Sequence, residues 1–162
     1  GVSNEDIKTG MASFRGVDRR FDFKIKTDKM VYLSDYAHHP EEIKQSILSM
    51  RALYGDKKLT GIFQPHLYTR TRDFYQEFAE SLSLLDEVIL TDIYPARELP
   101  IEGVSSQLIY DNLRPDIDKT LCKKEEVIDI LKKKEIEVLM TLGAGDIENY
   151  APQICEILNE RC

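Results

Sequence analysis

Three polar segments of this 162-residue chain carry residue types that could do chemistry. The first, DYAHHP at residues 35–40, places His38 and His39 beside Asp35. Neighbouring side chains in a turn diverge, and a catalytic zinc site needs three protein ligands and a water, so we expect no metal ion there. The segment is either an ordinary polar turn or a substrate-facing one, in which neutral histidine donates or accepts hydrogen bonds and Asp35 holds a hydroxyl or a metal-bound water.

The second segment is cationic and contains His66, Arg70 and Arg72. Guanidinium groups near the start of a helix, where backbone amides also point outward, suit a carboxylate or a phosphate. Arg72 could equally be a solvated residue paired with Asp73. Arg70 precedes the helix that the apolar spacing predicts over 71–85, and it is the stronger candidate for an anion contact.

The third segment is a glycine-rich turn made of Gly143, Ala144, Gly145 and Asp146. It lacks the third glycine and the later acidic residue of a dinucleotide fingerprint, so NAD is not expected. The glycines could serve backbone geometry only, or they could let a ligand approach bare amides, with Asp146 capping the next helix. The chain has no G-x-x-x-x-G-K-[ST] phosphate loop and no G-x-S-x-G nucleophile turn. It therefore has ligand-binding segments without a complete catalytic apparatus.

Apolar periodicity predicts the elements that hold these segments. Strands are expected at 21–25, 30–34, 59–63, 87–93, 119–122 and 137–142, and helices at 40–54, 71–85, 106–113, 123–135 and 146–160. The alternation predicts an α/β, Rossmann-like three-layer domain with a mainly parallel sheet of about six strands and helices on both faces, in which a leading hairpin adds one antiparallel strand. Ligands bind beyond the carboxyl ends of such strands, where all three polar segments begin.

The composition is that of an ordinary folded domain, with 42% apolar and 31% charged residues. A formal charge of −7, from 29 acids and 22 bases, argues against a nucleic-acid partner. No apolar run is long enough to span a membrane, and no signal peptide opens the chain. The cysteines Cys122, Cys155 and Cys162 lack C-x-x-C spacing and fit reduced thiols. We therefore expect a cytoplasmic protein without a membrane partner.

Residues 1–20 fit the α/β pattern less well than the rest. Ser3 precedes Ile7 and Met11 at helical spacing, and an arginine-rich link then leads into the first strand. A short amphipathic helix joined to a complete α/β unit suggests the tail of a preceding domain. We expect residues 1–20 to be that tail and residues 21–162 to form one domain of a longer protein.

Together the segments resemble the carboxy-terminal domain of the Mur ligase family. GVDRRFD, DYAHHPEEI, FQPHLYTRTRDF, DIYPARELPIEGVSS and TLGAGDI have the order and spacing of the family members that join L-alanine to UDP-N-acetylmuramate, and the match covers nearly the whole chain. The resemblance implies the last third of a carboxylate–amine ligase of peptidoglycan synthesis. Its ATPase domain and most of its sugar-nucleotide site would precede this chain, so the isolated chain should be inactive and should bind no cofactor tightly.

In that family, ATP and Mg²⁺ serve to phosphorylate the lactyl carboxylate of the sugar, and the amine of alanine then attacks the acyl phosphate. The resemblance implies that Arg20 and Asp35 face ATP. It also implies that His38 and Arg70 face the muramyl carboxylate and the incoming alanine and take part in catalysis. The other residues implied in substrate binding are His39, His66, Gly143, Ala144 and Gly145.

One departure from the family concerns Leu67, which stands where the family often has arginine. Leucine cannot hold a carboxylate, so that contact would pass to Arg70, to His66 or to another segment. Two alternatives remain open. One is the related ligase that recycles murein tripeptide, which has a similar AHHP turn. The other is a self-sufficient α/β binding module or phosphohydrolase that uses the acid and the histidines of the first segment.

Overall fold

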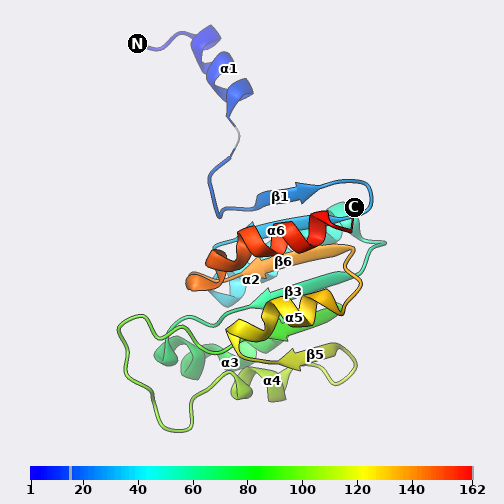
Figure 1. Cartoon of the computed structure of the whole chain (residues 1–162). Coiled ribbons are helices and arrows are strands. Elements are labelled where there is room, and N and C mark those ends of the chain that lie inside the picture. Colours follow the sequence, from blue (N-terminus) through cyan, green and yellow to red (C-terminus); the bar gives the residue numbers. More distant parts are fainter. Residues whose placement is uncertain (15, 162) are drawn as a thin grey trace.

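The computed structural model describes residues 1–14 and 16–161 and has a central six-stranded sheet with helices on both faces (Figure 1). The strands are β1 (Asp22–Lys26), β2 (Val31–Asp35), β3 (Leu59–Phe63), β4 (Glu87–Leu90), β5 (Asp118–Leu121) and β6 (Val138–Leu142). Their order across the sheet is β1-β2-β6-β3-β4-β5, and β1 is antiparallel to β2 while the other neighbours are parallel. The predicted α/β fold with a leading hairpin is confirmed.

The described residues also form six α-helices and two 3-10 turns. The helices are α1 (Asn4–Ser13), α2 (Pro40–Tyr54), α3 (Tyr68–Leu82), α4 (Gln107–Asn112), α5 (Val127–Lys132) and α6 (Ala151–Asn159), and the 3-10 turns are η1 (Lys124–Glu126) and η2 (Asp146–Tyr150). None of these helices is long and apolar enough to cross a bilayer.

The alternation of side chains along each strand builds two separate cores. On β2, Leu33 joins the core under α2, α3 and α4, whereas Tyr32 joins the core under α5 and α6. The central strands β3 and β6 are buried along their whole length because helices cover both of their faces. This explains why their sequences, LTGIF and VLMTL, are mainly apolar.

Several predicted boundaries are wrong, and packing between strands explains one of them. The strand predicted over 87–93 ends at Leu90, since its partner residues Phe63 on β3 and Leu121 on β5 are also the last residues of their strands. A strand continues only as far as a neighbour offers backbone partners.

The helix predicted over 146–160 starts as the 3-10 turn η2 and becomes α-helical only at Ala151. Pro152 lies in the first turn of α6, where its missing amide costs no hydrogen bond. Further inside a helix, a proline would have interrupted the backbone hydrogen bonds of that helix. The helix predicted over 123–135 is likewise shorter and consists of η1 followed by α5.

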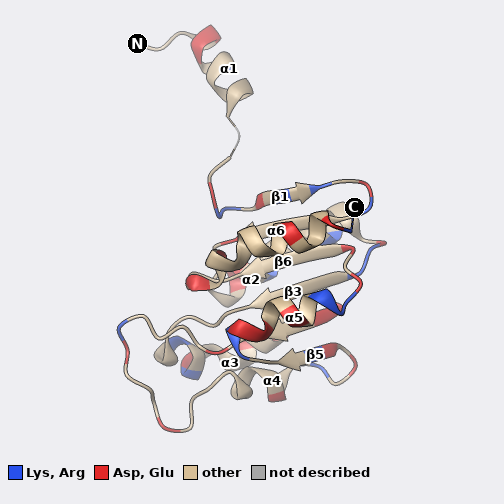
Figure 2. Ribbon diagram, viewed as in Figure 1, with Lys and Arg blue, Asp and Glu red and all other residues tan. Residues whose placement is uncertain are grey.

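The first helix stands apart from both cores (Figure 1). α1 begins with a capping box between Ser3 and Asp6, but it has no buried residue. Its apolar side chains Ile7 and Met11 are 52% and 70% exposed. The assignment of residues 1–20 to a preceding domain stays a prediction. Figure 2 shows acidic and basic segments interspersed along the ribbon, in keeping with the 29 acids and 22 bases of the sequence.

Candidate functional site

The three polar segments meet where the connections leave the sheet in opposite directions. β2 leads into α2 on one face, whereas the neighbouring β6 leads into η2 and α6 on the other. The backbone N–H of Gly143 donates to the Asp35 carbonyl at 3.2 Å, and that of Gln64 donates to the Leu142 carbonyl at 3.1 Å. A crevice at such a switch point is the usual ligand site of an open α/β sheet.

His38 lies half-buried at this edge with its tautomer defined by its partners. Its Nδ1 is 3.0 Å from the Tyr36 carbonyl and 3.3 Å from the Glu42 carboxylate, both of which can only accept, so Nδ1 carries a proton. In the neutral ring, Nε2 is then an acceptor. Burial acts to raise the pKa of Glu42, but hydrogen bonds from the His38 and His39 amides, together with the His38 charge, outweigh it and lower that pKa.

His66 lies next to His38, with 6.2 Å between the ring centroids, and it has the opposite tautomer. The Arg70 guanidinium donates to His66 Nδ1 at 3.4 Å, so in the neutral ring the proton is on Nε2. The ring also stacks on Tyr94 with centroids 5.6 Å apart. Burial and then the Arg70 charge lower the pKa of His66 below 6.5. This edge of the sheet thus combines a hydrogen-bond acceptor on His38, a donor on His66 and the cation of Arg70.

Arg70 lies in the first turn of α3, and the prediction that it precedes the helix is wrong. The helix starts at Tyr68, after Leu67, whose φ of 73° is in the left-handed region. Glu98, on the loop after β4, accepts from the Thr69 amide at 3.0 Å and from the Thr69 hydroxyl. These bonds lower the pKa of Glu98. Because the cap comes from a distant loop, the local sequence does not reveal this helix start.

Arg20 and Asp35 line a separate cavity of about 260 Å³ at the end of β2. The Ser46 hydroxyl on α2 donates to Asp35 Oδ2 at 2.7 Å and holds that carboxylate in place. Gln45 and Ser49 line the same cavity. The exposed Arg20 guanidinium lies 5.1 Å from the centre of the Tyr36 ring. The structure therefore brings together the two residues that the resemblance assigns to ATP.

The glycine-rich turn is shaped by Gln64, a buried residue that sequence analysis missed. Gly143 has a φ of 140°, and a Cβ there would lie 2.8 Å from the Gln64 carbonyl oxygen. A Cβ on Gly145 would lie 2.2 Å from Gln64 Oε1. The close approach of Gln64 to the backbone of this turn thus explains why both positions are glycine. The prediction that Asp146 caps a helix is wrong: its carboxylate accepts from Gln64 Nε2 at 2.8 Å and pairs with Lys124.

Burial acts to raise the pKa of Asp146, and the bonds from Lys124 and Gln64 lower it by more. This ion pair fastens η1 to η2 across the edge of the sheet. Arg19, which with Arg20 makes a basic pair in the sequence, was assigned no role there, yet it donates hydrogen bonds to the carbonyls of Gly143 and Gly145. Only its place in the arginine-rich link could have suggested it.

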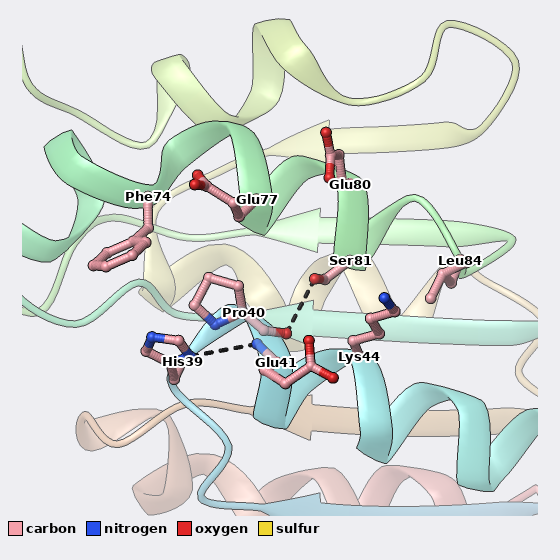
Figure 3. A pocket seen from close by; sticks show the side chains of 9 residues that line it. All are labelled: His39, Pro40, Glu41, Lys44, Phe74, Glu77, Glu80, Ser81 and Leu84. Carbon is pink, nitrogen blue, oxygen red and sulfur yellow. Dashed lines mark hydrogen bonds between the residues drawn. The ribbon is translucent and has the colours of Figure 1, made fainter.

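His39 caps α2. Its Nδ1 accepts from the Glu41 amide at 3.4 Å, and its ring meets Phe74 edge-on at 5.2 Å. It closes one end of a groove of about 390 Å³ between α2 and α3 (Figure 3). Among the described residues that line this groove, Lys44 is the one lysine or arginine and lies with three glutamates, so the groove does not suit an anion.

Among residues 1–14 and 16–161, no three His, Cys, Asp or Glu side chains gather as a metal site requires. Cys122 and Cys155 are free thiols, and Cys162 lies outside the described residues. Burial raises the pKa of Cys122 to about 11, so this thiol is a poor nucleophile at neutral pH.

The chain matches the protein family described as Mur ligase, glutamate ligase domain, over residues 19–147. It is 77% identical over 161 residues to the UDP-N-acetylmuramate–L-alanine ligase of Phocaeicola vulgatus, a match that covers 99% of this chain and 35% of that protein. A protein of the same name from Porphyromonas gingivalis is 50% identical over 163 residues. That match covers 100% of this chain and 36% of that protein. The chain thus spans about a third of the length of these relatives.

Solved structures with the same fold include a UDP-N-acetylmuramate-alanine ligase from Thermotoga maritima. It superposes with a TM-score of 0.78 at 25% identity, over 100% of this chain and 35% of that chain. A murein peptide ligase from Psychrobacter arcticus superposes with a TM-score of 0.71 at 17% identity. The match covers 98% of this chain and 33% of that chain, and it shows a shared fold.

Proposed function

The chain belongs to the Mur ligase family through its glutamate ligase domain, and on this basis we propose that it is the carboxy-terminal domain of an ATP-dependent ligase that joins L-alanine to UDP-N-acetylmuramate. Residues 21–162 would form that domain, and residues 1–20 the link from a preceding ATPase domain. The observation that carries the proposal is the meeting of His38, His66 and Arg70 at one edge of the sheet. The names of the relatives support the choice of substrates.

Arg20 and Asp35 would form the wall that this domain contributes to the ATP site. The Arg20 guanidinium suits a phosphate or the ribose, and the Asp35 carboxylate suits a ribose hydroxyl. Mg²⁺ keeps several of its waters and binds through one or two carboxylates plus phosphate oxygens, so the Asp35 carboxylate, in a cavity that Glu42 also lines, fits a contact to such a water. When bound, the ion would neutralise phosphate charge. A single wall would hold ATP weakly until the preceding domain closes over it.

Arg70 and His38 would act on the muramyl carboxylate and the incoming alanine. Arg70 supplies positive charge to hold a carboxylate and to stabilise the charge of the transferring phosphoryl group. The Nε2 lone pair of neutral His38 can accept the proton that the ammonium group of alanine must lose before the amine attacks. His66 would donate its Nε2 proton to a carboxylate oxygen, which compensates in part for the arginine missing at Leu67.

Gly143, Ala144 and Gly145 would form the rim of this pocket. The Gly143 amide and the carbonyls of both glycines already bond within the protein, so the rim would act through close approach of the backbone. His39 caps α2 and would contribute to substrate binding by holding the start of that helix beside His38.

The proposed reaction can be tested on the full-length protein that contains this chain. ADP release in the presence of Mg²⁺ should require both UDP-N-acetylmuramate and L-alanine. If the tripeptide L-alanyl-γ-D-glutamyl-diaminopimelate replaced alanine as the better substrate, the recycling ligase would be the correct assignment. Hydrolysis of a simple phosphoester by residues 1–162 alone would instead favour the self-sufficient phosphohydrolase.

A pair of arginine variants tests the site within the same enzyme. Arg70→Ala should lower kcat/KM by about 100-fold, because a charge held against the reacting groups is worth ~2–4 kcal/mol. Arg72→Ala is the matched control: Arg72 is exposed and pairs with its neighbour Asp73, so less than about a threefold change is expected. Equal losses in the two variants, measured at saturating ATP, would remove Arg70 from the reaction.

A further inference from the structure

Arg19 is held in an unfavourable backbone conformation by specific bonds. Its φ of 61° lies in the left-handed region, which an arginine rarely adopts without compensation. Its N–H donates to Asp22 Oδ2 at 3.3 Å, and its carbonyl accepts from the Tyr36 amide at 2.7 Å. The second bond ties the link ahead of β1 to the first polar segment. The strain therefore serves to hold this link against the edge of the sheet.

The side chain of Arg19 reaches the third polar segment as well. Its Nη2 donates to the Gly143 carbonyl at 3.4 Å and to the Gly145 carbonyl at 3.3 Å. The guanidinium carbon also lies 4.7 Å from the centre of the Tyr36 ring. A planar guanidinium can stack on a ring while it donates in its own plane, which a lysine ammonium cannot do. One side chain thus contacts both the first and the third polar segment.

A counter-charge anchors Arg19 to the sheet. Glu148 lies 3.9 Å from Arg19 Nε, and it also accepts from the Ser34 hydroxyl on β2 and lies 3.6 Å from Lys24 on β1. The Arg19 side chain is 31% exposed, so these contacts are only partly screened by solvent. The network joins the link, two strands and η2.

We infer that Arg19 is a positioning residue, which fastens the link to the edge of the crevice and so fixes the Gly143–Gly145 turn and the neighbouring Arg20 relative to each other. This inference rests on the proposed function, because Arg20 would face ATP and the turn would rim the alanine pocket. In this role Arg19 itself would contact neither ligand. Its charge is used by protein carbonyls, the Tyr36 ring and Glu148.

Hydrogen exchange in the full-length protein, without ligands, tests the fastening directly. In Arg19→Ala the Tyr36 amide should exchange at least about tenfold faster, because the carbonyl that protects it is no longer held. The Leu33 amide inside the sheet should keep its protection. Arg72→Ala is the matched arginine control and should change neither amide. An unchanged Tyr36 amide in Arg19→Ala would overturn the inference.

Kinetics then test the consequence for the site. In Arg19→Ala the KM values for ATP and L-alanine should each rise by about five- to tenfold, while kcat changes by less than about threefold. Arg19→Lys keeps the charge but cannot both stack and donate, so it should restore only part of both effects. If Arg19→Ala does not fold, Arg19→Lys decides, and wild-type exchange at Tyr36 in that variant would contradict the inference.

Because the exchange experiment needs no substrate, it separates the two proposals. If the wild-type protein did not ligate alanine but Arg19→Ala still exchanged faster at Tyr36, the proposed function would be refuted and the positioning role of Arg19 would stand. If the wild type ligated alanine and Arg19→Ala lost activity with normal exchange at Tyr36, the positioning role would be refuted and the proposed function would stand.

Discussion

The imidazoles of His38 and His66 carry opposite hydrogen-bonding character at the same edge of the sheet. Nδ1 of His38 faces a carbonyl and a carboxylate, whereas Nδ1 of His66 faces the Arg70 guanidinium. The two neutral rings therefore present an acceptor and a donor, although the residues are of the same type. Side-chain partners, and not residue identity, determine which nitrogen can take a proton from a substrate.

His66 should titrate below its ordinary pKa of 6.5, because burial and the Arg70 charge both oppose protonation. A depressed histidine pKa means that the folded state binds a proton less readily than the unfolded state. The associated stability is complete above about pH 6.5 and is lost as the pH falls through the folded pKa.

An NMR titration of the His66 ring protons measures this pKa. Arg70→Ala should raise it, but not fully to 6.5, since burial is the larger cause. Arg72→Ala should leave it unchanged. A pKa at or above 6.5 in the wild type would show that the ring is not desolvated as described.

At the scale of the elements, the opposite end of the sheet is organised by a buried carboxylate. Glu87, the first residue of β4, is 1% exposed and bonds to Lys58 at 2.9 Å, to Lys134 and to the Thr60 hydroxyl at 3.1 Å. Burial acts to raise the pKa of Glu87, but the bonds from Lys134 and Lys58 outweigh it and lower that pKa from 4.5. These contacts hold the starts of β3 and β4 to the segment before β6.

Glu87→Gln should lower the free energy of unfolding by about 2–4 kcal/mol at pH 7, because it removes the buried counter-charge of Lys134 and one of the two carboxylate partners of Lys58. The difference between variant and wild type should narrow as the pH falls below 4.5, where the unfolded wild type takes up a proton first. Urea unfolding at pH 7 and at pH 3.5 measures the difference in unfolding free energy between variant and wild type at each pH.

Asp118→Asn is the control for that experiment. Asp118 lies 3.7 Å from the same Lys58, but its side chain is 74% exposed, so its loss should cost less than about 1 kcal/mol. Equal costs for the two variants would mean that Glu87 contributes no more than a surface pair.

For the whole molecule, the proposed function makes the described residues one wall of the ATP site. The predicted ATP contacts lie in a cavity with Arg20 and Asp35, and the chain has no phosphate loop of its own. Its net charge of −7 also disfavours an anionic ligand that is not held by specific cations.

Residues 1–162 alone should therefore bind ATP with a dissociation constant weaker than about 1 mM, which corresponds to less than ~4 kcal/mol of binding free energy. Isothermal calorimetry with ATP and Mg²⁺ measures this affinity, and the full-length protein serves as the positive control. A micromolar constant for the 162-residue chain would contradict a site built from two domains.

The sequence by itself determined the fold class, the strand-to-helix order and the three polar segments at the strand ends. Apolar periodicity is a local property, and the carboxyl ends of parallel strands share an edge, so His38, Arg70 and Gly143 could be expected near one another. The start of α3 at Tyr68 could not be predicted from the local sequence, because Glu98, which caps that helix, lies 29 residues after Thr69 in the chain.

Tertiary structure alone decided how the site is held together. Arg19 bonds to carbonyls 124 and 126 residues further along the chain, and Gln64 bonds to Asp146 across 82 residues. No local pattern marks such residues, since an arginine in a link or a glutamine after a strand is equally at home in solvent. Their roles follow from which backbone groups the folded sheet leaves within reach of their side chains, and that is a property of packing.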